Sequence, residues 1–342
     1  MKLNFLAAIG LVAAAALPAQ AQDVTTLKVH FFLPPTSFAN TLFIQPWCDK
    51  VAKESNQKLK CQLYPSMQLG GTPPQLYDQV RDGVADIVWT LPGYTAGRFP
   101  SIEAFELPFM MQSPEATSKA LWDFVQLHGQ NEFKDVKPLA FHVHGDGVFH
   151  MSGKPVKSMA DLRGLKLRAP TRQTNKFIAM LGATPVSMPV PQVGDALSKG
   201  VIDGAVVPYE VVPAVKLQEL AKFHSETDPK EAAFYTATFI FAMNKAKYDS
   251  LPADLKKVID ANSGQALSGQ IGKAFLQADV EGKKLVSPAS VNVIPASELA
   301  TWKQLGNKLA ADWVKDMDAK GLQGSKLLDD AKALIAKHAA AR

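Results

Sequence analysis

The sequence predicts an α/β fold built as two lobes, and two observations support this prediction. Segments with strand composition alternate with segments of helical spacing over the first two thirds of the chain, which is typical of mostly parallel α/β layers. The chain has 342 residues, and 321 of them remain once the N-terminal segment discussed below is removed. That length suits two lobes better than one hydrophobic core.

The elements of the first half can be assigned in order. A strand at 27–32 is followed by a loop with two prolines at 33–37. A helix then runs to Lys53, because apolar side chains recur at about the spacing of one helical turn. The alternation continues with a strand at 59–64, a helix at 74–82, a strand at 85–89 and a strand at 137–144.

Residues 161–208 form a second, more informative block. A turn at Arg163-Gly164 leads into a short strand at 165–168, which Pro170 stops because proline cannot donate to a sheet ladder. Arg168 therefore lies at the carboxyl end of a strand, where open α/β sheets place their ligands. The block continues with a helix that ends near Leu181-Gly182, a strand at 184–188 interrupted by prolines, a helix capped by Gly200 and a strand that begins at 201–204.

The last third predicts more helix than strand. A β-rich apolar run at 234–243 precedes a long helix at 251–272 that opens with Pro252-Ala253-Asp254. A further helix from Lys273 and a short strand at 291–294 follow, and the end from Thr301 is helical and amphipathic.

The N-terminus predicts export. Lys2 provides a positive start, and an apolar run at 5–17 has the length of a signal-peptide core. Ala19-Gln20-Ala21 is a small-x-small cleavage site, so residues 1–21 are predicted to be a signal peptide cleaved after Ala21. A membrane anchor would need about 20 apolar residues, and Pro18 interrupts this run. We therefore expect the product in the periplasm, without an anchor.

Charge and motifs exclude several classes of function. Cleavage would remove only Lys2 from the charged residues and leave 36 basic and 32 acidic side chains, spread along the chain without a basic stripe, so we expect no nucleic-acid partner. Gly145-x-Gly147 lacks the third glycine of a dinucleotide-binding loop, and the sequence contains no G-x-S-x-G, P-loop or H-E-x-x-H motif. His142, His144 and His150 lack the further ligands of a zinc site. The sequence predicts no enzyme, no cofactor and no metal.

The two cysteines leave one question open. Cys48 lies in the predicted helix at 38–54 and Cys61 opens the next strand. A helix and the strand that follows it pack together, and an oxidising compartment permits a disulfide. Both a bridge between Cys48 and Cys61 and two separate buried thiols remain open at this stage.

Several segments in a fixed order carry a family resemblance. They are D-L-R-G-L-K-L-R-A-P, L-G-A-T-P-V-S-M-P-V-P-Q-V and A-L-S-K-G-V-I-D-G-A-V-V-P within 161–208, together with Q-L-G-G at 68–71, F-E-L-P-F at 105–109 and L-P-A-D-L at 251–255. In this order the chain resembles the extracytoplasmic solute-binding proteins of TRAP transporters, the DctP family. The resemblance extends from about Leu27 to Val258.

The resemblance implies a two-lobed periplasmic binding protein fold with hinge strands and a long connecting helix. Lobe I would comprise 22–145 plus 233–272, and lobe II 146–232 plus 273–342, with the ligand cleft between them. It also implies capture of a small organic acid and delivery to the small and large membrane subunits of a TRAP permease. We expect the binding protein to be a monomer.

The resemblance also assigns a role to Arg168 and suggests a ligand class. The arginine of this motif forms a bidentate salt bridge with the ligand carboxylate in the family, and a guanidinium is suited to that geometry. Members that bind polar acids often carry an asparagine where this chain has Val207, and another arginine upstream where this chain has 145–151. Buried polar groups without partners are costly. We therefore predict an aromatic or otherwise apolar monocarboxylate.

Aromatic side chains are candidates for the apolar wall. Trp89 ends a strand, and Tyr94 follows it in T-L-P-G-Y; a flat ring there could stack on an aromatic ligand, or Trp89 could lie in the core. Phe31 and Phe32 point to opposite sides of the first strand, and we choose Phe31 for the cleft. Val190 and Val207 would line the far wall. Tyr209, which follows Val207-Pro208, is a further candidate, as are Tyr235 and Thr236 near the predicted hinge. Each of the three could instead have a structural role.

Two side chains are candidates for a second polar contact. His150 could donate to a ligand oxygen in place of the missing arginine, or could be an ordinary loop histidine. Arg172 could offer another cation or face water. If either supplies a charge, the alternative ligand is a C4-dicarboxylate or a short 2-oxo or hydroxy acid. An exported enzyme and a ligand-sensing module are the alternatives from other functional classes.

Overall fold

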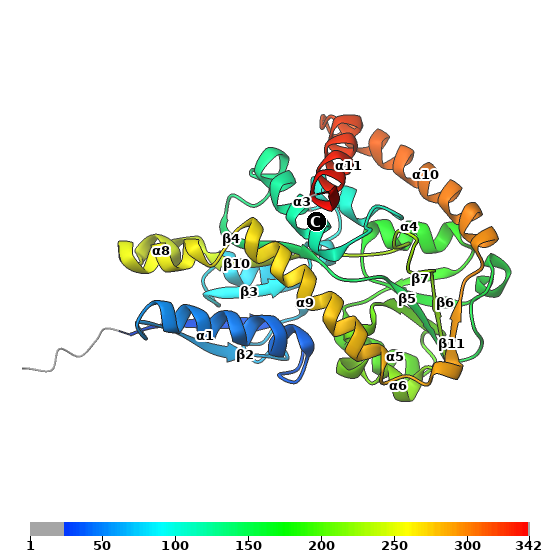
Figure 1. Cartoon of the computed structure of the whole chain (residues 1–342), viewed down its shortest axis with the longest axis horizontal. Coiled ribbons are helices and arrows are strands. Elements are labelled where there is room, and N and C mark those ends of the chain that lie inside the picture. Colours follow the sequence, from blue (N-terminus) through cyan, green and yellow to red (C-terminus); the bar gives the residue numbers. More distant parts are fainter. Residues whose placement is uncertain (1–23, 341–342) are drawn as a thin grey trace, which may run out of the picture.

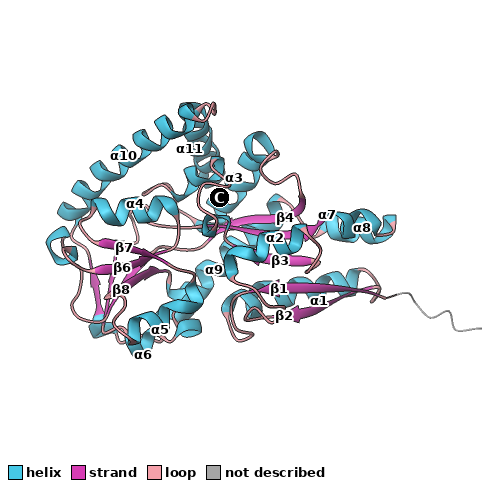
Figure 2. Ribbon diagram, turned by 180° about the vertical axis from the view of Figure 1, so that it is seen from behind, coloured by secondary structure: helices cyan, strands magenta, loops and turns pink. Residues whose placement is uncertain are grey.

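The computed structural model of the chain describes residues 24–340, so the predicted signal peptide and its cleavage site lie outside the described residues. Two β-sheets occupy opposite halves of the molecule, and helices surround each of them (Figure 2). This mixed α/β architecture in two parts confirms the predicted fold class.

The first sheet has five strands in the order β2-β1-β3-β10-β4. Strands β1 and β2 are parallel, as are β1 and β3, whereas β10 runs antiparallel to both of its neighbours. The strands are β1 (Thr25–Phe31), β2 (Leu59–Tyr64), β3 (Ile87–Thr90), β4 (Val136–Val143) and β10 (Thr238–Asn244).

The second sheet has six strands in the order β11-β9-β5-β8-β6-β7. Here β5 is the strand that runs antiparallel to both of its neighbours, β8 and β9. The strands are β5 (Val148–Met151), β6 (Lys166–Ala169), β7 (Thr184–Ser187), β8 (Gly204–Val207), β9 (Phe223–Glu226) and β11 (Val291–Val293).

Strands β5 and β10 are antiparallel to their neighbours for the same reason, which is the path of the chain between the two halves. The chain passes from β4 into β5 and later from β9 into β10, so each of these strands enters its sheet from the other half of the molecule. A strand that enters a sheet at the end where its neighbouring strands finish must run antiparallel to them. The predicted parallel pattern therefore holds within each half and fails at the crossings.

Helices cover both sheets, and α9 spans the two halves of the molecule diagonally (Figure 1). No helix within residues 24–340 is long and apolar enough to cross a membrane. The helices are α1 (Gln45–Glu54), α2 (Leu76–Arg81), α3 (Pro114–Phe124), α4 (Arg172–Met180), α5 (Val193–Ser198), α6 (Leu217–Leu220), α7 (Lys245–Ser250), α8 (Ala253–Ala261), α9 (Gln265–Lys283), α10 (Ala296–Ala319) and α11 (Gly324–Ala340).

The helix boundaries predicted after Leu251 were wrong. The predicted helix at 251–272 is interrupted at 262–264, where Gly264 adopts a φ of +92° that side chains rarely tolerate. The next helix, α9, then continues through Gly272 to Lys283. Gly272 does not end a helix, because it lies where a β-carbon would collide with the Pro114 backbone. Its role is the close packing of α9 on α3.

The C-terminal helix α11 returns to the half that contains the first sheet. It packs on α3, and two histidine–aspartate contacts join the helices: His128 Nε2 to Asp330 at 2.7 Å and His338 Nε2 to Asp123 at 2.8 Å. The predicted division places 273–342 in lobe II, whereas this helix is held against residues of lobe I.

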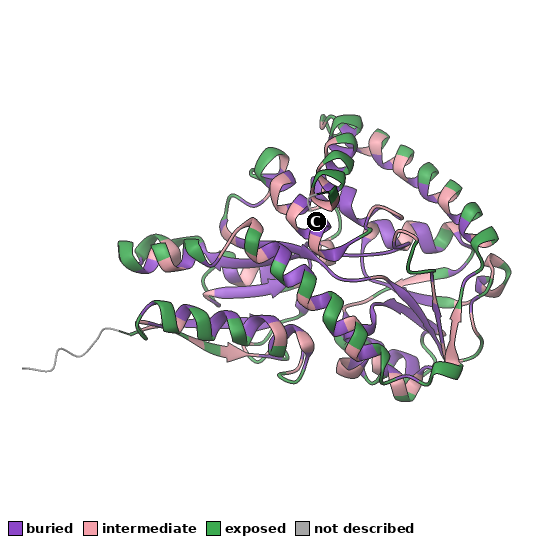
Figure 3. Ribbon diagram, viewed as in Figure 1, coloured by how far each residue is buried: buried purple, intermediate pink, exposed green. Residues whose placement is uncertain are grey.

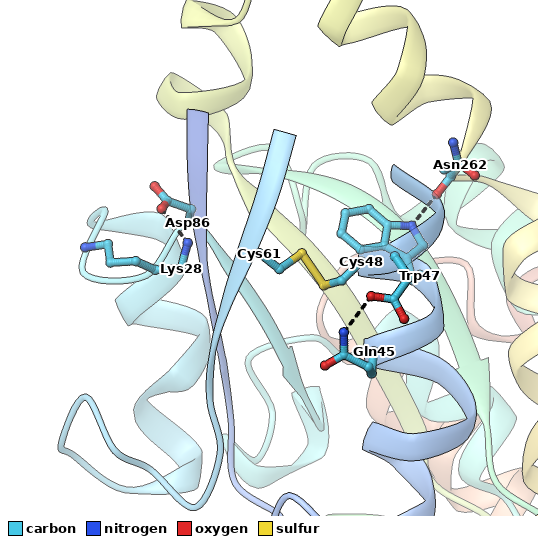
Figure 4. Close-up of a disulfide and its surroundings, with 8 residues drawn as sticks. Lys28, Gln45, Trp47, Cys48, Cys61, Asp86 and Asn262 are labelled. Atoms are coloured by element: carbon cyan, nitrogen blue, oxygen red, sulfur yellow. Dashed lines mark hydrogen bonds between the residues drawn. A yellow bond between two sulfur atoms is a disulfide. The ribbon is translucent and has the colours of Figure 1, made fainter. Parts of the chain in front are cut away.

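Cys48 in α1 and Cys61 in β2 form a disulfide, with 5.7 Å between their Cα atoms (Figure 4). The neighbouring Trp47 is buried, and its indole nitrogen donates to the Asn262 carbonyl at 2.8 Å. The disulfide and this hydrogen bond fix α1 between the edge strand and the break before α9. The inner strands of both sheets are buried beneath helices whose outer faces are exposed, whereas the edge strands β2, β7 and β11 are only partly buried (Figure 3).

Candidate functional site

Arg168 lies on β6 and is fully buried. Two backbone carbonyls orient its guanidinium: Nε donates to Met188 at 3.0 Å and Nη1 donates to Val206 at 3.1 Å. The remaining nitrogen, Nη2, is buried and has no hydrogen-bond partner among the described residues. Rigid anchors on one side and a free donor on the other prepare this guanidinium for an additional acceptor.

The charge of Arg168 is not neutralised within residues 24–340. No aspartate or glutamate of that part of the chain forms a salt bridge with it. Removing a charged group from water costs several kcal/mol unless a counter-charge compensates. The arrangement is therefore suited to an anion that arrives from outside the chain.

The rings of His144 and Tyr235 near Arg168 are neutral at physiological pH. Burial lowers the pKa of His144 to about 3, and the positive charge of Arg168 acts in the same direction. Burial raises the pKa of Tyr235, whose ring lies 4.8 Å from that of His144, so the phenol stays protonated. One guanidinium surrounded by neutral rings suits a ligand that carries a single carboxylate on an apolar group.

Strand register places several predicted residues on the face of the second sheet that carries Arg168. Arg168 pairs with Ala205, and Ala205 pairs with His150, so the three side chains share one face, and Val207 lies two residues further along β8. The Nδ1 atoms of His150 and His224 are 2.7 Å apart, and His150 Nε2 is buried without a partner. Burial lowers the pKa of His150 to about 3. This histidine is a neutral polar group and not a second cation.

A cavity of about 520 Å³ opens between the two halves of the molecule. Arg168 does not line it, but Met188, whose carbonyl accepts from Arg168, does. A neighbouring hollow of about 300 Å³ includes Phe32 on one side and Pro189 on the other. Residues from the end of the first sheet face residues that follow β6 and β7. The larger cavity is lined by Pro74, Gly93, Tyr94, Ala96, Pro170, Thr171, Arg172, Asn175, Lys176, Ser187, Met188 and Pro189.

The aromatic candidates differ in their position. Phe31 pairs in register with Trp89 and is fully buried, whereas Phe32 lines the hollow. Of these two phenylalanines, Phe32 and not the chosen Phe31 borders the cleft. Trp89 is also fully buried; its ring stacks on Phe32 at 4.9 Å and its indole nitrogen donates to His142 at 2.8 Å. Trp89 therefore supports the cleft wall from behind Phe32.

Arg172 is neutralised within the protein. Its guanidinium forms a salt bridge with Glu103, including a 2.9 Å contact from Nε, and a second, longer one with Asp316. Glu103 also accepts a hydrogen bond from Gln173 at 2.7 Å. Because these acidic groups already occupy Arg172, the arrangement gives it no free charge for a second ligand carboxylate.

Four further predicted residues make contacts within the protein, and none of them is among the residues that line these two hollows. Thr236 donates to the His144 carbonyl at 3.0 Å, and Tyr235 packs on His144. Tyr209 lies edge-on to His150 with ring centroids 5.5 Å apart, and its hydroxyl is buried without a partner. Val190 is buried, and its backbone N–H donates to the Tyr94 hydroxyl at 3.1 Å.

Sequence reasoning missed Glu106 as a member of this region and named Tyr94 only as a ring that follows Trp89. Tyr94 ends a 3-10 turn, Pro92–Tyr94, just after β3, and Glu106 accepts from the Thr238 N–H and hydroxyl at 3.1 and 2.8 Å. Burial raises the pKa of Glu106 to about 7. An aromatic residue at a turn after a strand and a glutamate inside F-E-L-P-F were the available signals.

Helix α9 contacts the segments where the chain changes halves. Asp279 on this helix accepts the Glu210 N–H at 2.8 Å, and its other oxygen occupies the space where a β-carbon of residue 145 would lie. A side chain at residue 145 would therefore have to displace the Asp279 carboxyl. Burial raises the pKa of Asp279 to about 8; the Glu210 N–H opposes this shift and the negative charge of Asp146 adds to it.

We expect Asp279→Asn to change how stability depends on pH. The folded state retains a proton on Asp279 that the unfolded chain releases near pH 4, so this carboxyl makes the fold less stable as pH rises from about 4 to about 8. The asparagine variant should gain stability over the parent at pH 8 and lose that advantage near pH 4. Urea unfolding at several pH values measures the difference.

The matched control for this prediction is Asp195→Asn, because Asp195 is exposed and paired only with Lys199. Its unfolding curves should follow those of the parent at every pH. His142 and His144, whose pKa values burial lowers to about 3, favour the fold as pH rises above that range and affect parent and variants alike. A parallel pH profile of parent and Asp279→Asn would contradict the prediction.

Two solved structures resemble this chain along nearly its whole length. One is a TRAP solute-binding protein from Rhodoferax ferrireducens T118 in complex with copurified benzoate: TM-score 0.90, 52% identity, covering 93% of this chain and 99% of that chain. The other is a marine-metagenome TRAP solute-binding protein specific for aromatic acid ligands, in complex with metahydroxyphenylacetate: TM-score 0.89, 49% identity, covering 92% and 99%.

A more distant relative comes from Escherichia coli K12. It is the 2,3-diketo-L-gulonate-binding periplasmic protein YiaO, 28% identical over 288 residues, or 82% of this chain and 83% of that protein. The family model for bacterial extracellular solute-binding proteins of family 7, DctP, matches residues 33–316. The match covers the second sheet with Arg168 and every strand of the first sheet except β1, and it confirms the resemblance found in the sequence. This chain belongs to the DctP family of bacterial extracellular solute-binding proteins.

Proposed function

We propose that this protein is the periplasmic component of a TRAP transporter, that it captures an aromatic or otherwise apolar monocarboxylate, and that it delivers this ligand to the small and large membrane subunits of the permease. One observation carries the ligand class: Arg168 is a fully buried guanidinium with a free Nη2 and no acidic partner in the described chain. A carboxylate would supply the missing counter-charge.

The absence of a second free cation in the described cleft supports a single carboxylate. Arg172 is engaged by Glu103 and Asp316, and Lys176, which also lines the larger cavity, pairs with Asp316 at 2.9 Å. His150 and His144 are neutral at physiological pH. Phe32 and Tyr94 line the two hollows and offer apolar surface to the rest of the ligand. The two similar solved structures contain benzoate and metahydroxyphenylacetate, which have this chemistry.

We further propose that the two halves act as lobes that close on the ligand. Lobe I comprises 22–145 plus 233–272 and lobe II comprises 146–232 plus 273–342, with α11 of the latter held against α3. A ligand that contacts both lobes only when they are closed shifts the equilibrium toward the closed form. The contacts that cross between the proposed lobes, such as Tyr94 with Val190 and Glu103 with Arg172, support this mechanism.

We expect aromatic monocarboxylates to raise the melting temperature of the mature protein. Ligand at 100 times its dissociation constant stabilises the folded state by about 2.7 kcal/mol. Benzoate, 3-hydroxybenzoate, phenylacetate and cinnamate should give a shift, whereas succinate and malate should not, because no second cation is free. Thermal-shift measurements with Arg168→Ala in parallel separate site binding from general salt effects. A shift with succinate or malate and none with the aromatic acids would refute the proposed ligand class.

A further inference from the structure

We propose that Tyr94 supplies lobe I's half of the carboxylate site, so that its hydroxyl links ligand binding to lobe closure. This inference rests on the proposed function, because it assigns a second donor to the carboxylate that Arg168 is proposed to bind. It concerns a residue in the first half of the molecule, whereas Arg168 lies in the second.

Tyr94 reaches from one half of the molecule to the other. It ends the turn that follows β3 of the first sheet, yet its hydroxyl accepts a hydrogen bond from the backbone of Val190, which follows β7 of the second sheet. The side chain also lines the cavity of about 520 Å³ between the two halves. Its hydroxyl is thus positioned in the proposed cleft by a contact that exists only when the two halves are together.

The hydrogen bonds around this hydroxyl leave one donor unused. The Val190 N–H occupies a lone pair of the oxygen, and residues 24–340 provide no recorded acceptor for the O–H hydrogen. Arg168 cannot serve, since a guanidinium has no acceptor. Burial raises the pKa of Tyr94, against the opposing influence of the Arg168 charge, so the phenol remains a donor. Two donors, Tyr94 O–H and Arg168 Nη2, therefore lack an acceptor in the same region.

Packing holds the Tyr94 ring in this position. The ring lies edge-on to Phe32 with centroids 5.8 Å apart, and Phe32 in turn stacks on Trp89. The preceding residue, Gly93, allows the turn to approach the other half closely, because a β-carbon there would lie 2.6 Å from Cγ2 of Thr171. The hydroxyl is therefore pre-organised, which reduces the entropic cost of binding.

A carboxylate fits the requirements of both donors. One oxygen can accept from Arg168 while the other accepts from Tyr94, and the negative charge compensates the buried guanidinium. With the lobes apart, the ligand would retain Arg168 and lose Tyr94. The difference between these two states is the free energy by which the ligand would favour closure.

The test is Tyr94→Phe, which removes the hydroxyl and keeps the ring. With benzoate as the probe, calorimetry should show affinity reduced by about 10- to 100-fold, the usual effect of a lost hydrogen bond to a charged group. Stopped-flow measurements should place most of the loss in a faster dissociation rate, because the contact forms on closure. The melting temperature without ligand should change little. The matched control is Tyr248→Phe, whose hydroxyl bonds Asp260 on an exposed surface and whose benzoate affinity should equal that of the parent.

The possible outcomes test the role of Tyr94 separately from the proposed ligand class. Benzoate binding by Tyr94→Phe within twofold of the parent would overturn the role of Tyr94 and leave the aromatic ligand class intact. A lower melting temperature with unchanged affinity would show a structural role and also overturn it. If the parent binds a different carboxylate in the thermal-shift screen, the proposed ligand class fails, and the same two variants test Tyr94 with that acid.

Discussion

Arg168→Ala is expected to abolish nearly all ligand binding and to leave the fold intact. Removing one member of a desolvated charge pair typically costs about 3–5 kcal/mol, which corresponds to an affinity loss of about a few hundred- to a few thousand-fold. Arg168→Lys should also bind poorly, because an ammonium group cannot reproduce the planar fork. Isothermal calorimetry with benzoate measures both losses.

The structure adds a second expectation for the protein without ligand. Arg168 is buried without a counter-charge in the described chain, so replacing it by methionine should leave stability unchanged or raised. The control is Arg163→Ala in the same segment, because Arg163 is exposed and its removal should affect neither affinity nor stability. An Arg168→Ala affinity within tenfold of the parent would remove Arg168 from the binding site.

Removal of the Cys48–Cys61 disulfide is expected to give the second large effect, on stability instead of affinity. The two cysteines are 13 residues apart, and closing a loop of that length stabilises a fold by about 3 kcal/mol through the entropy of the unfolded chain. The double variant Cys48→Ala/Cys61→Ala should therefore unfold at lower urea concentration. Benzoate affinity should be retained, because the disulfide joins α1 to an edge strand of the first sheet and Arg168 belongs to the second.

The reduced parent provides the comparison for this experiment. Under reducing conditions the parent should be as stable as the double variant. Under oxidising conditions the parent should be more stable than the double variant and than the reduced parent. A thiol assay on the unfolded, unreduced parent should find no reactive thiol. Equal urea unfolding curves for the oxidised parent and the double variant would contradict a stabilising disulfide.

Much of the architecture could be predicted because it is encoded locally. Alternating strand and helix patterns, with prolines and glycines between them, correctly indicated β6, α4, β7, α5 and β8 within a few residues. The same local order located Arg168 near the end of a strand. Such features depend on the conformational preferences of consecutive residues, so a single sequence is sufficient to identify them.

Glycine shows where local reasoning failed. Gly272 suggested a helix end, yet α9 continues through it because the missing side chain allows contact with Pro114 on α3. Gly264, which does interrupt the helices, was placed inside a predicted helix. A helix-ending glycine and a helix-packing glycine look alike in sequence, and only the neighbour across the interface distinguishes them.

The site itself was decided by contacts between distant residues. The sequence by itself determined the α/β alternation, the family resemblance and the position of Arg168 at a strand end. Only the tertiary structure brought Tyr94 to Val190, paired Arg172 with Glu103, joined His150 to His224 and placed Phe32 rather than Phe31 at the cleft. These contacts join residues about 70 to 100 positions apart, so they depend on how the chain crosses between the two sheets. Local propensity carries no information about that crossing, which the packing of α9 and the close approach at Gly145 determine.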